Sequence, residues 1–189
     1  YAKRAGIPTV GMIHSWDVLT TEGRIVVPLD HYFVWNQVMK TELIKIHGIA
    51  EEQIRMTGIP QFDVYAEPIS PVGKEEFLRQ QGLDPGKPTV MFGTSAGGLT
   101  PEEPEILARL VNALTLASSG KVQFLVRIHQ QDDIGRYASI DDGNVRFQVP
   151  GAQMANLEDK RLMESGDMDL LRDTFAYSDV VINTASTIS

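Results

Sequence analysis

The sequence predicts an α/β protein with two units that each contain a parallel sheet. Apolar runs typical of buried strands alternate with amphipathic helical segments along the whole chain. Residues 66–73 contain two prolines and a glycine without any periodicity, and this stretch divides the alternation. The 189 residues are 42% hydrophobic and 22% charged, as in globular proteins. We therefore expect one unit over residues 1–65, a linker over 66–73 and a second unit over 74–189.

Three short strands and one helix are expected in the first unit. Residues 9–13, 32–35 and 54–57 are short runs rich in β-branched or aromatic residues, which favour strands. Asn36 is predicted to cap a helix that ends before Gly48, since asparagine favours the first position and glycine the last. The apolar residues predicted on one face of this helix are Val38, Met39, Leu43 and Ile46.

The second unit repeats this alternation. Thr100 is predicted to cap a helix that has Pro101 at its first position, and Glu103 completes a capping box with Thr100. Glycine-rich residues 93–98 form a loop before this helix. The other predicted elements are strands at 89–92, 122–128, 144–149 and 180–182, and helices at 74–81, 132–139 and 167–177.

Composition excludes several functional classes. The chain has no cysteine, which excludes disulfides, thiolate metal sites and a cysteine nucleophile. A net charge of −8 argues against a nucleic-acid-binding surface, because phosphate neutralisation needs clustered cations. No apolar run reaches the roughly 18 residues of a membrane-spanning helix. No His or carboxylate cluster has metal-ligand spacing, so we expect neither a metal nor a cofactor. The chain opens at Tyr1 and closes just after a strand, so we expect a piece of a longer protein.

A histidine and an aspartate follow the first predicted strand. In open parallel sheets, ligands bind at the carboxyl ends of strands, so His14 and Asp17 are candidate catalytic residues. The ordinary pKa of histidine, about 6.5, suits a general base near neutral pH. Asp17 could orient His14, act as the base itself, or cap the next turn. His14 could equally be a half-buried histidine that bonds to the backbone.

The glycine-rich loop offers candidate phosphate ligands, namely Thr94, Ser95 and Gly97. Glycines let backbone N–H groups approach an anion, and the N-terminus of the following helix attracts negative charge. The loop lacks the Lys of a P-loop and the spacing of a dinucleotide fingerprint. An ordinary flexible connection is the alternative interpretation.

Arg127 and His129 lie at the end of the strongest predicted strand. Alternation along a strand predicts that both side chains face the same way, where they could bind a phosphate or diphosphate. Alternatively, they pair with Asp132 or Asp133 at the rim of the sheet.

Ser186 and Thr187 follow the last predicted strand. Hydroxyls and free backbone N–H groups at a helix start can bind a phosphate without a metal. The same residues could simply cap the helix, and both roles can hold together.

Four segments resemble motifs of GT-B-fold glycosyltransferases, and they occur along the chain in the same order as in that family. Residues 57–63 (TGIPQFD) resemble the TG-x-P-x-x-D crossover between the two domains. Residues 14–23 (HSWDVLTTEG) resemble the SWDN-x-TS-K-G segment of surface-carbohydrate transferases. Residues 127–132 (RIHQQD) resemble K/R-x-H-P-x-D, and residues 178–187 (SDVVINTAST) resemble a strand and turn that end in ST. CDP-glycerol glycerophosphotransferases, teichoic-acid transferases and, more distantly, non-hydrolysing UDP-N-acetylglucosamine 2-epimerases share this layout.

The resemblance implies two Rossmann-like units of GT-B type, both incomplete in this chain. Residues 1–65 would be the C-terminal part of the acceptor-side domain, and residues 74–189 the N-terminal part of the domain that binds the nucleotide donor. His14 or Asp17 would then serve as base. Arg127 and His129 would face the donor diphosphate, and Ser186 and Thr187 would hold its phosphates.

The chain also departs from the family pattern. Gln130 stands where the family usually has proline, Val18 where asparagine is common, and Glu22 where lysine is common. Loss of a lysine near the acceptor could change the acceptor or weaken phosphate binding.

Three functions remain open at this point. A transferase would move a sugar or polyol phosphate from a nucleotide-activated donor to a polysaccharide or lipid-linked acceptor. A sugar-nucleotide epimerase and a non-catalytic nucleotide-sugar-binding domain are the alternatives. The transferase interpretation implies no metal, no nucleic-acid partner, and a cytoplasmic protein that could lie peripherally at the inner face of the membrane.

Overall fold

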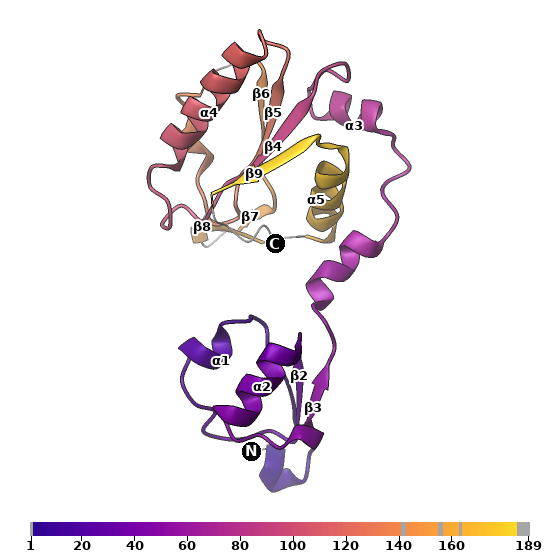
Figure 1. Cartoon of the computed structure of the whole chain (residues 1–189), viewed down its shortest axis with the longest axis vertical. Helices are drawn as coiled ribbons and strands as arrows, with labels where there is room; N and C mark the ends of the chain where they lie inside the picture. Colours follow the sequence, from indigo (N-terminus) through magenta and orange to yellow (C-terminus); the bar gives the residue numbers. More distant parts are fainter. Residues whose placement is uncertain (1, 141–142, 155–156, 163, 185–189) are drawn as a thin grey trace. The chain divides into compact units, whose positions relative to one another are not determined.

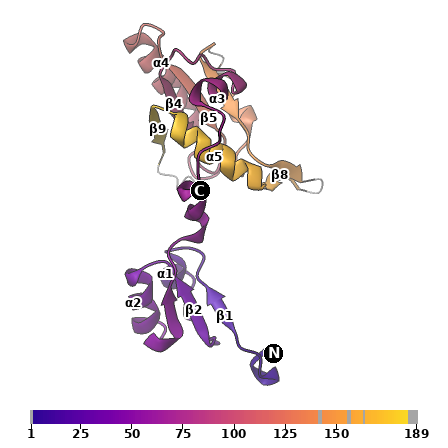
Figure 2. The same cartoon turned by 90° about the vertical axis from the view of Figure 1, so that its right-hand side faces the viewer.

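A computed structural model describes residues 2–140, 143–154, 157–162 and 164–184 (Figures 1 and 2). The chain divides into two compact units, Tyr1–Asp63 and Val64–Ser189. Each unit contains a parallel sheet with helices, which confirms the predicted α/β class. Residues 66–73, the expected linker, fall within the second of these units.

The first unit is built on a three-stranded parallel sheet in the order β1-β2-β3. The side chains of its central strand, β2, alternate in burial because one face of the sheet is covered. Tyr32 and Val34 are buried, whereas His31 is exposed. The strands are β1 (Val10–Met12), β2 (His31–Val34) and β3 (Ile54–Met56). The helices are η1 (Ala2–Ala5), α1 (Val18–Thr21), α2 (Gln37–Lys45) and η2 (Glu51–Gln53), and η3 (Pro60–Ala66) leads into the second unit.

Helix α2 begins as the sequence predicted. The side chain of Asn36 accepts a hydrogen bond from the backbone N–H of Met39 at 3.0 Å, which satisfies one of the free donors at the helix start. Met39 and Leu43 are buried in the core of the unit. Val38 and Ile46, predicted on the same face, are exposed. The side chain of Val38 points about 100° away from that of Met39 around the helix axis, and so it leaves the buried face. Ile46 follows the last residue of α2, Lys45.

His47 has a structural role in this unit. Its side chain is buried, and its Nδ1 accepts a hydrogen bond from the backbone N–H of Ile25 at 3.1 Å. Its Nε2 lies 2.8 Å from the carbonyl oxygen of Leu19. These two contacts tie the end of α2 to α1 and to the segment that follows α1.

The second unit contains a four-stranded parallel sheet in the order β6-β5-β4-β9. Its strands are β4 (Thr89–Gly93), β5 (Gln123–Arg127), β6 (Val145–Gln148) and β9 (Val180–Asn183). Its helices are α3 (Lys74–Gln80), α4 (Glu103–Ala117), η4 (Ile134–Tyr137) and α5 (Ser165–Tyr177). An antiparallel pair, β7 (Ala152–Met154) and β8 (Leu157–Leu162), precedes α5, and the sequence analysis did not predict it.

Helices cover both faces of this sheet, as a parallel sheet requires. Figure 1 shows α4 on one side of the sheet, and α3 and α5 on the other. On the α4 side, Leu107 and Val111 pack against Phe124 and Val126. On the other side, Leu125 of the same strand packs against residues of α3, so β5 alternates between two cores.

Helix α5 fixes the segment that precedes α3. The hydroxyl of Tyr177 donates to the carbonyl oxygen of Val72 at 2.7 Å, and the backbone N–H of Ser70 donates to Asp173 at 3.3 Å. Lys74 forms an ion pair with Asp179 at 2.7 Å. Part of the stretch expected as a linker is therefore bound to the second unit through specific hydrogen bonds.

The Asn36 cap gives a stability prediction. Asn36→Ala should lower the free energy of unfolding of the first unit by about 1 kcal/mol, because the Met39 N–H loses its partner. Both tryptophans, Trp16 and Trp35, lie in the first unit, so tryptophan fluorescence during urea denaturation reports on that unit. Gln37→Ala, at the exposed neighbouring position, is the control. Equal losses in both variants would contradict the capping role.

Candidate functional site

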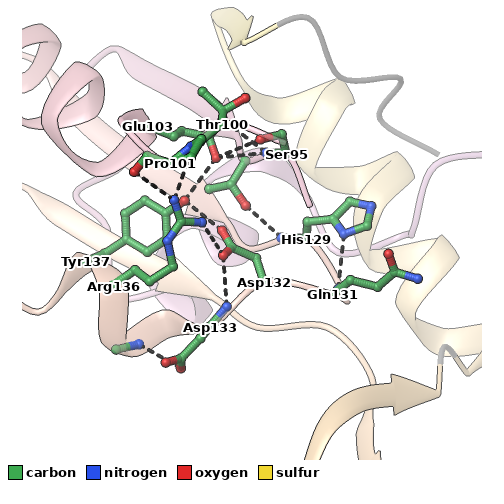
Figure 3. Close-up of polar contacts among 12 residues, drawn as sticks. Ser95, Thr100, Pro101, Glu103, His129, Gln131, Asp132, Asp133, Arg136 and Tyr137 are labelled. Atoms are coloured by element: carbon green, nitrogen blue, oxygen red, sulfur yellow. Dashed lines mark hydrogen bonds and ion pairs between the residues drawn. The ribbon is translucent and has the colours of Figure 1, made fainter. Parts of the chain in front are cut away.

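The residues that follow β4, β5 and β9 meet at one edge of the second sheet, because the carboxyl ends of parallel strands lie at the same edge. The candidate site is built from this edge. Figure 3 shows that Ser95, from the loop after β4, lies beside Glu103 at the start of α4. Asp132 and Tyr137, from the segment after β5, lie beside the same carboxylate.

Glu103 is the most heavily hydrogen-bonded side chain of this edge. It is 0% exposed, and the backbone N–H of Ser95 donates to both of its carboxylate oxygens at 3.0 Å. The hydroxyls of Ser95 and Tyr137 lie 3.1 and 3.0 Å from Oε2. The hydroxyl of Thr184, just after β9, donates to Oε1. One buried carboxylate thus joins the loop after β4, helix η4 and the end of β9.

The predicted capping box between Thr100 and Glu103 is therefore wrong. Helix α4 begins at Glu103 instead of Pro101, and the side chain of Glu103 turns inward. The signal that could have revealed this is the helical spacing: Glu103, Leu107 and Val111 lie on one face of α4, and all three are buried.

Tyr137 lies between two carboxylates. Its hydroxyl is 2.7 Å from Oδ2 of Asp132, as well as 3.0 Å from Oε2 of Glu103. Burial raises the pKa of Tyr137 strongly, and the hydrogen bond to Asp132 and the charge of Glu103 add to this, so the hydroxyl keeps its proton. The other oxygen of Asp132 pairs with Arg136, whose guanidinium also donates to the carbonyl oxygen of Thr100 at 2.9 Å.

Gly97 has a packing role. A Cβ atom at this position would lie 2.6 Å from Oδ1 of Asp132 and 3.1 Å from Nη1 of Arg136. The loop after β4 therefore passes directly against the ion pair of these two residues, and only glycine allows this approach.

The side chains of Thr94 and Ser95 already have partners within the protein. Both residues are buried. Oγ1 of Thr94 accepts a hydrogen bond from the backbone N–H of His129 at 2.8 Å. The N–H and hydroxyl of Ser95 both bond to Glu103. These contacts fix the loop after β4 to the segment after β5 through Thr94, and to α4 through Ser95.

His129 presents a hydrogen-bond donor at this edge. Its Nδ1 accepts from the backbone N–H of Gln131 at 3.0 Å, so the neutral ring carries its proton on Nε2. Figure 3 shows the ring of His129 directed away from Asp132 and Tyr137. Burial lowers the pKa of His129, although the nearby carboxylates of Asp132 and Glu103 oppose this shift. The residue is therefore a neutral N–H donor at neutral pH.

Arg127 is buried on the side of the sheet that α5 covers. It is only 5% exposed, and its guanidinium donates to Oε1 of Gln148 in β6 and, at 2.9 Å, to the carbonyl oxygen of Asp167 in α5. Burial lowers its pKa, and Asp167 and Tyr65 oppose this effect. Within the described ranges, neither Arg127 nor His129 forms an ion pair with Asp132 or Asp133. Arg127 and His129 therefore contact different elements.

The two candidate bases lie in the first unit. His14 is exposed and follows β1, and Asp17 occupies the capping position of α1 without a side-chain capping bond. Oδ1 of Asp17 accepts a hydrogen bond from the hydroxyl of Ser15. This bond, followed by a hydrogen bond from its own backbone N–H and by the charge of His14, lowers the pKa of Asp17. A carboxylate with a lowered pKa is a weaker base.

Ser186 and Thr187 lie outside the described residues, so the structure does not place them. Among the residues that it does place, no group of three His, Asp or Glu side chains could hold a metal ion. None of the described helices is long and apolar enough to cross a membrane.

Gly97 gives a second stability prediction. Gly97→Ala should lower the melting temperature of the second unit by several degrees, because its Cβ would displace the Asp132–Arg136 pair at a cost of about 1–3 kcal/mol. Gly98→Ala is the matched control, since nothing lies within 4 Å of a Cβ there. Differential scanning calorimetry measures both. A loss in Gly98→Ala as large as in Gly97→Ala would contradict the packing role.

Comparison with known proteins gives partial matches. No family model matches the chain. A processive diacylglycerol beta-glucosyltransferase of Staphylococcus epidermidis is 39% identical over 69 residues, which is 36% of this chain and 17% of the relative. The enzyme of the same name from Staphylococcus saprophyticus is 30% identical over 81 residues, 43% of this chain and 20% of the relative. The matches thus span a fifth or less of these relatives' length.

Solved structures match over more of the chain. The S. aureus MnaA–UDP co-structure has a TM-score of 0.61 at 12% identity, over 98% of this chain and 48% of that one. The wall teichoic acid polymerase TagF, as its H444N variant, has a TM-score of 0.45 at 16% identity, over 85% of this chain and 36% of that one. The parallel sheets and the likeness to MnaA together show that this chain has the GT-B-type fold of two Rossmann-like units, as its sequence motifs predicted.

Proposed function

We propose that this chain is part of a glycosyltransferase that moves a sugar or polyol phosphate from a nucleotide-activated donor to a polysaccharide or lipid-linked acceptor. The observation that carries the proposal is the edge of the second sheet, where β5 ends in the buried cation Arg127 and is followed two residues later by His129, which offers an Nε2–H donor. The partial matches to two enzymes named as diacylglycerol glucosyltransferases support the same reaction class.

The donor phosphates would bind at this edge. In open parallel sheets, ligands bind at the carboxyl ends of the strands. Arg127 forms no ion pair within the part of the chain that the structure describes, and although Asp167 partly offsets its charge, the guanidinium would favour an anion nearby. His129 would donate from Nε2 to a phosphate oxygen and stabilise the charge that develops on the leaving group. Ser186 and Thr187 would add hydroxyl and backbone donors, and Thr94, Ser95 and Gly97 would shape the loop.

The acceptor would be activated by the first unit. His14 would remove the proton from the acceptor hydroxyl, and Asp17, which stays ionised, would orient the imidazole and stabilise its charged form. The proposal needs no metal, because protein donors neutralise the leaving phosphate. Nucleotide-activated donors and a lipid-linked acceptor would place the enzyme in the cytoplasm, at the inner face of the membrane.

Nucleotide binding tests the proposal directly. UDP, CDP, GDP and their monophosphates are compared by thermal shift, with and without magnesium. A nucleotide at 100 times its dissociation constant should stabilise the protein by about 2.7 kcal/mol. His129→Ala should abolish the response, and His31→Ala, at an exposed histidine of the first unit, should retain it. A full response in His129→Ala would contradict the assigned donor site.

Catalysis distinguishes the transferase from the alternatives. In the full-length protein, His129→Ala should lower turnover about 100-fold, as expected for loss of one donor to a developing anion. Free nucleotide released only when acceptor is present indicates a transferase. Epimer interconversion without acceptor would instead indicate an epimerase, and binding without turnover a binding domain.

The pKa of His129 gives a pH prediction. Because the folded protein lowers this pKa below its ordinary value of 6.5, unfolding takes up a proton in weakly acidic solution. The stability of the second unit should therefore fall as the pH decreases below the ordinary histidine value of about 6.5, and recover as the pH rises above it. His129→Gln should remove this part of the dependence. Calorimetry across the range measures the slope, and an unchanged slope in His129→Gln would contradict the lowered pKa.

A further inference from the structure

We propose that the carboxylate of Glu103 acts as an internal anion. It occupies an anion-binding cavity at the edge of the second sheet, and it positions the loop after β4 and the end of β9 for binding of the nucleotide phosphates. The second part of this proposal rests on the proposed function, whereas the first part stands on the contacts of Glu103 alone.

Neutral donors from three elements converge on this carboxylate. The loop after β4 supplies the N–H and hydroxyl of Ser95, and the end of β9 supplies the hydroxyl of Thr184. Helix η4 supplies the hydroxyl of Tyr137, whose single proton is shared with Asp132. Among the described residues, no Lys, Arg or His forms an ion pair with Glu103. Proteins bind small anions in the same way, with backbone N–H groups and hydroxyls that converge on the charge.

Because the carboxylate of Glu103 is buried, it and the donors around it depend on one another for hydrogen bonds. A carboxylate that is 0% exposed is stable only if its oxygens are hydrogen-bonded, because its hydration is lost. Conversely, the N–H and the hydroxyl of Ser95 are buried donors whose acceptor is Glu103, whereas the hydroxyl of Tyr137 also has Asp132 as an acceptor. Removal of the carboxylate leaves several donors around a cavity of about its size.

Glu103 also positions His129 through a short chain of contacts. Glu103 holds the N–H of Ser95, and the preceding residue, Thr94, accepts the N–H of His129 through Oγ1 at 2.8 Å. The carboxylate therefore helps to fix the position of the His129 backbone, and with it the position of the imidazole ring. Glu103 is a positioning residue, since it acts on the proposed donor site through Ser95 and Thr94.

The cavity is tested by chemical rescue. Glu103→Ala should lower the melting temperature of the second unit by about 5 °C or more, because buried donors lose their acceptor. Acetate or formate should restore it in a saturable way, whereas acetamide and sodium chloride at equal concentration should not. In NMR spectra, acetate should return the Ser95 amide resonance toward its wild-type position. Equal effects of acetate and chloride on Glu103→Ala would overturn the internal-anion proposal.

A matched control lies two residues further along α4. The carboxylate of Glu105 is exposed and pairs with Arg109 at 2.7 Å. Glu105→Ala should melt close to wild type and show no specific response to acetate. If Glu103→Ala does not fold alone, it is refolded in acetate and, in parallel, in chloride. Recovery of the far-UV circular dichroism in acetate only supports the cavity, and failure in both overturns it.

Nucleotide affinity tests the positioning role. Glu103→Ala should bind the nucleotide that best stabilises wild type at least tenfold more weakly, and saturating acetate should recover most of this loss. Unchanged affinity in a folded Glu103→Ala would overturn the positioning role. If wild type responds to no nucleotide, the positioning role falls with the proposed function, whereas acetate rescue still decides whether the cavity exists.

Discussion

The buried carboxylate of Glu103 is the interaction on which the edge of the second sheet depends. Its hydrogen bonds join the loop after β4, helix η4 and the end of β9, which are far apart in the sequence. Loops at the end of a parallel sheet have no backbone ladder of their own, so side-chain contacts must fix them. A buried charge does this specifically, because each displaced donor leaves the charge less well satisfied.

The two units differ in how they present polar groups. In the second unit, both faces of the sheet are covered, and the polar residues of its edge are buried in a connected network. In the first unit, His14 is exposed, and Asp17 is held chiefly by the neighbouring Ser15 hydroxyl. The polar groups at this edge of the second unit are therefore held by contacts between distant parts of the chain, whereas Asp17 of the first unit is held by a neighbour in the sequence.

The positions of several candidate residues could be predicted from the sequence, but their hydrogen-bond partners could not. Patterning placed Thr94, Ser95, Gly97, Arg127 and His129 near strand ends, which is where the structure has them. It could not show that Glu103 takes the donors of Ser95, or that Gly97 packs against an ion pair. Arg127 likewise donates to partners in β6 and α5 that lie 21 and 40 residues further along the chain.

The sequence by itself determined the alternation of strands and helices, the parallel class of the sheets, and helix caps such as Asn36. All three features depend on local spacing and on residues that are a few positions apart. Only the tertiary structure decided which polar groups are partners. The N–H of Ser95 bonds to Glu103, and the partners of Glu103 include Thr184, 81 residues away, in place of the predicted Thr100. A buried donor takes the nearest acceptor in space, and distance in space is set by the packing of the whole sheet.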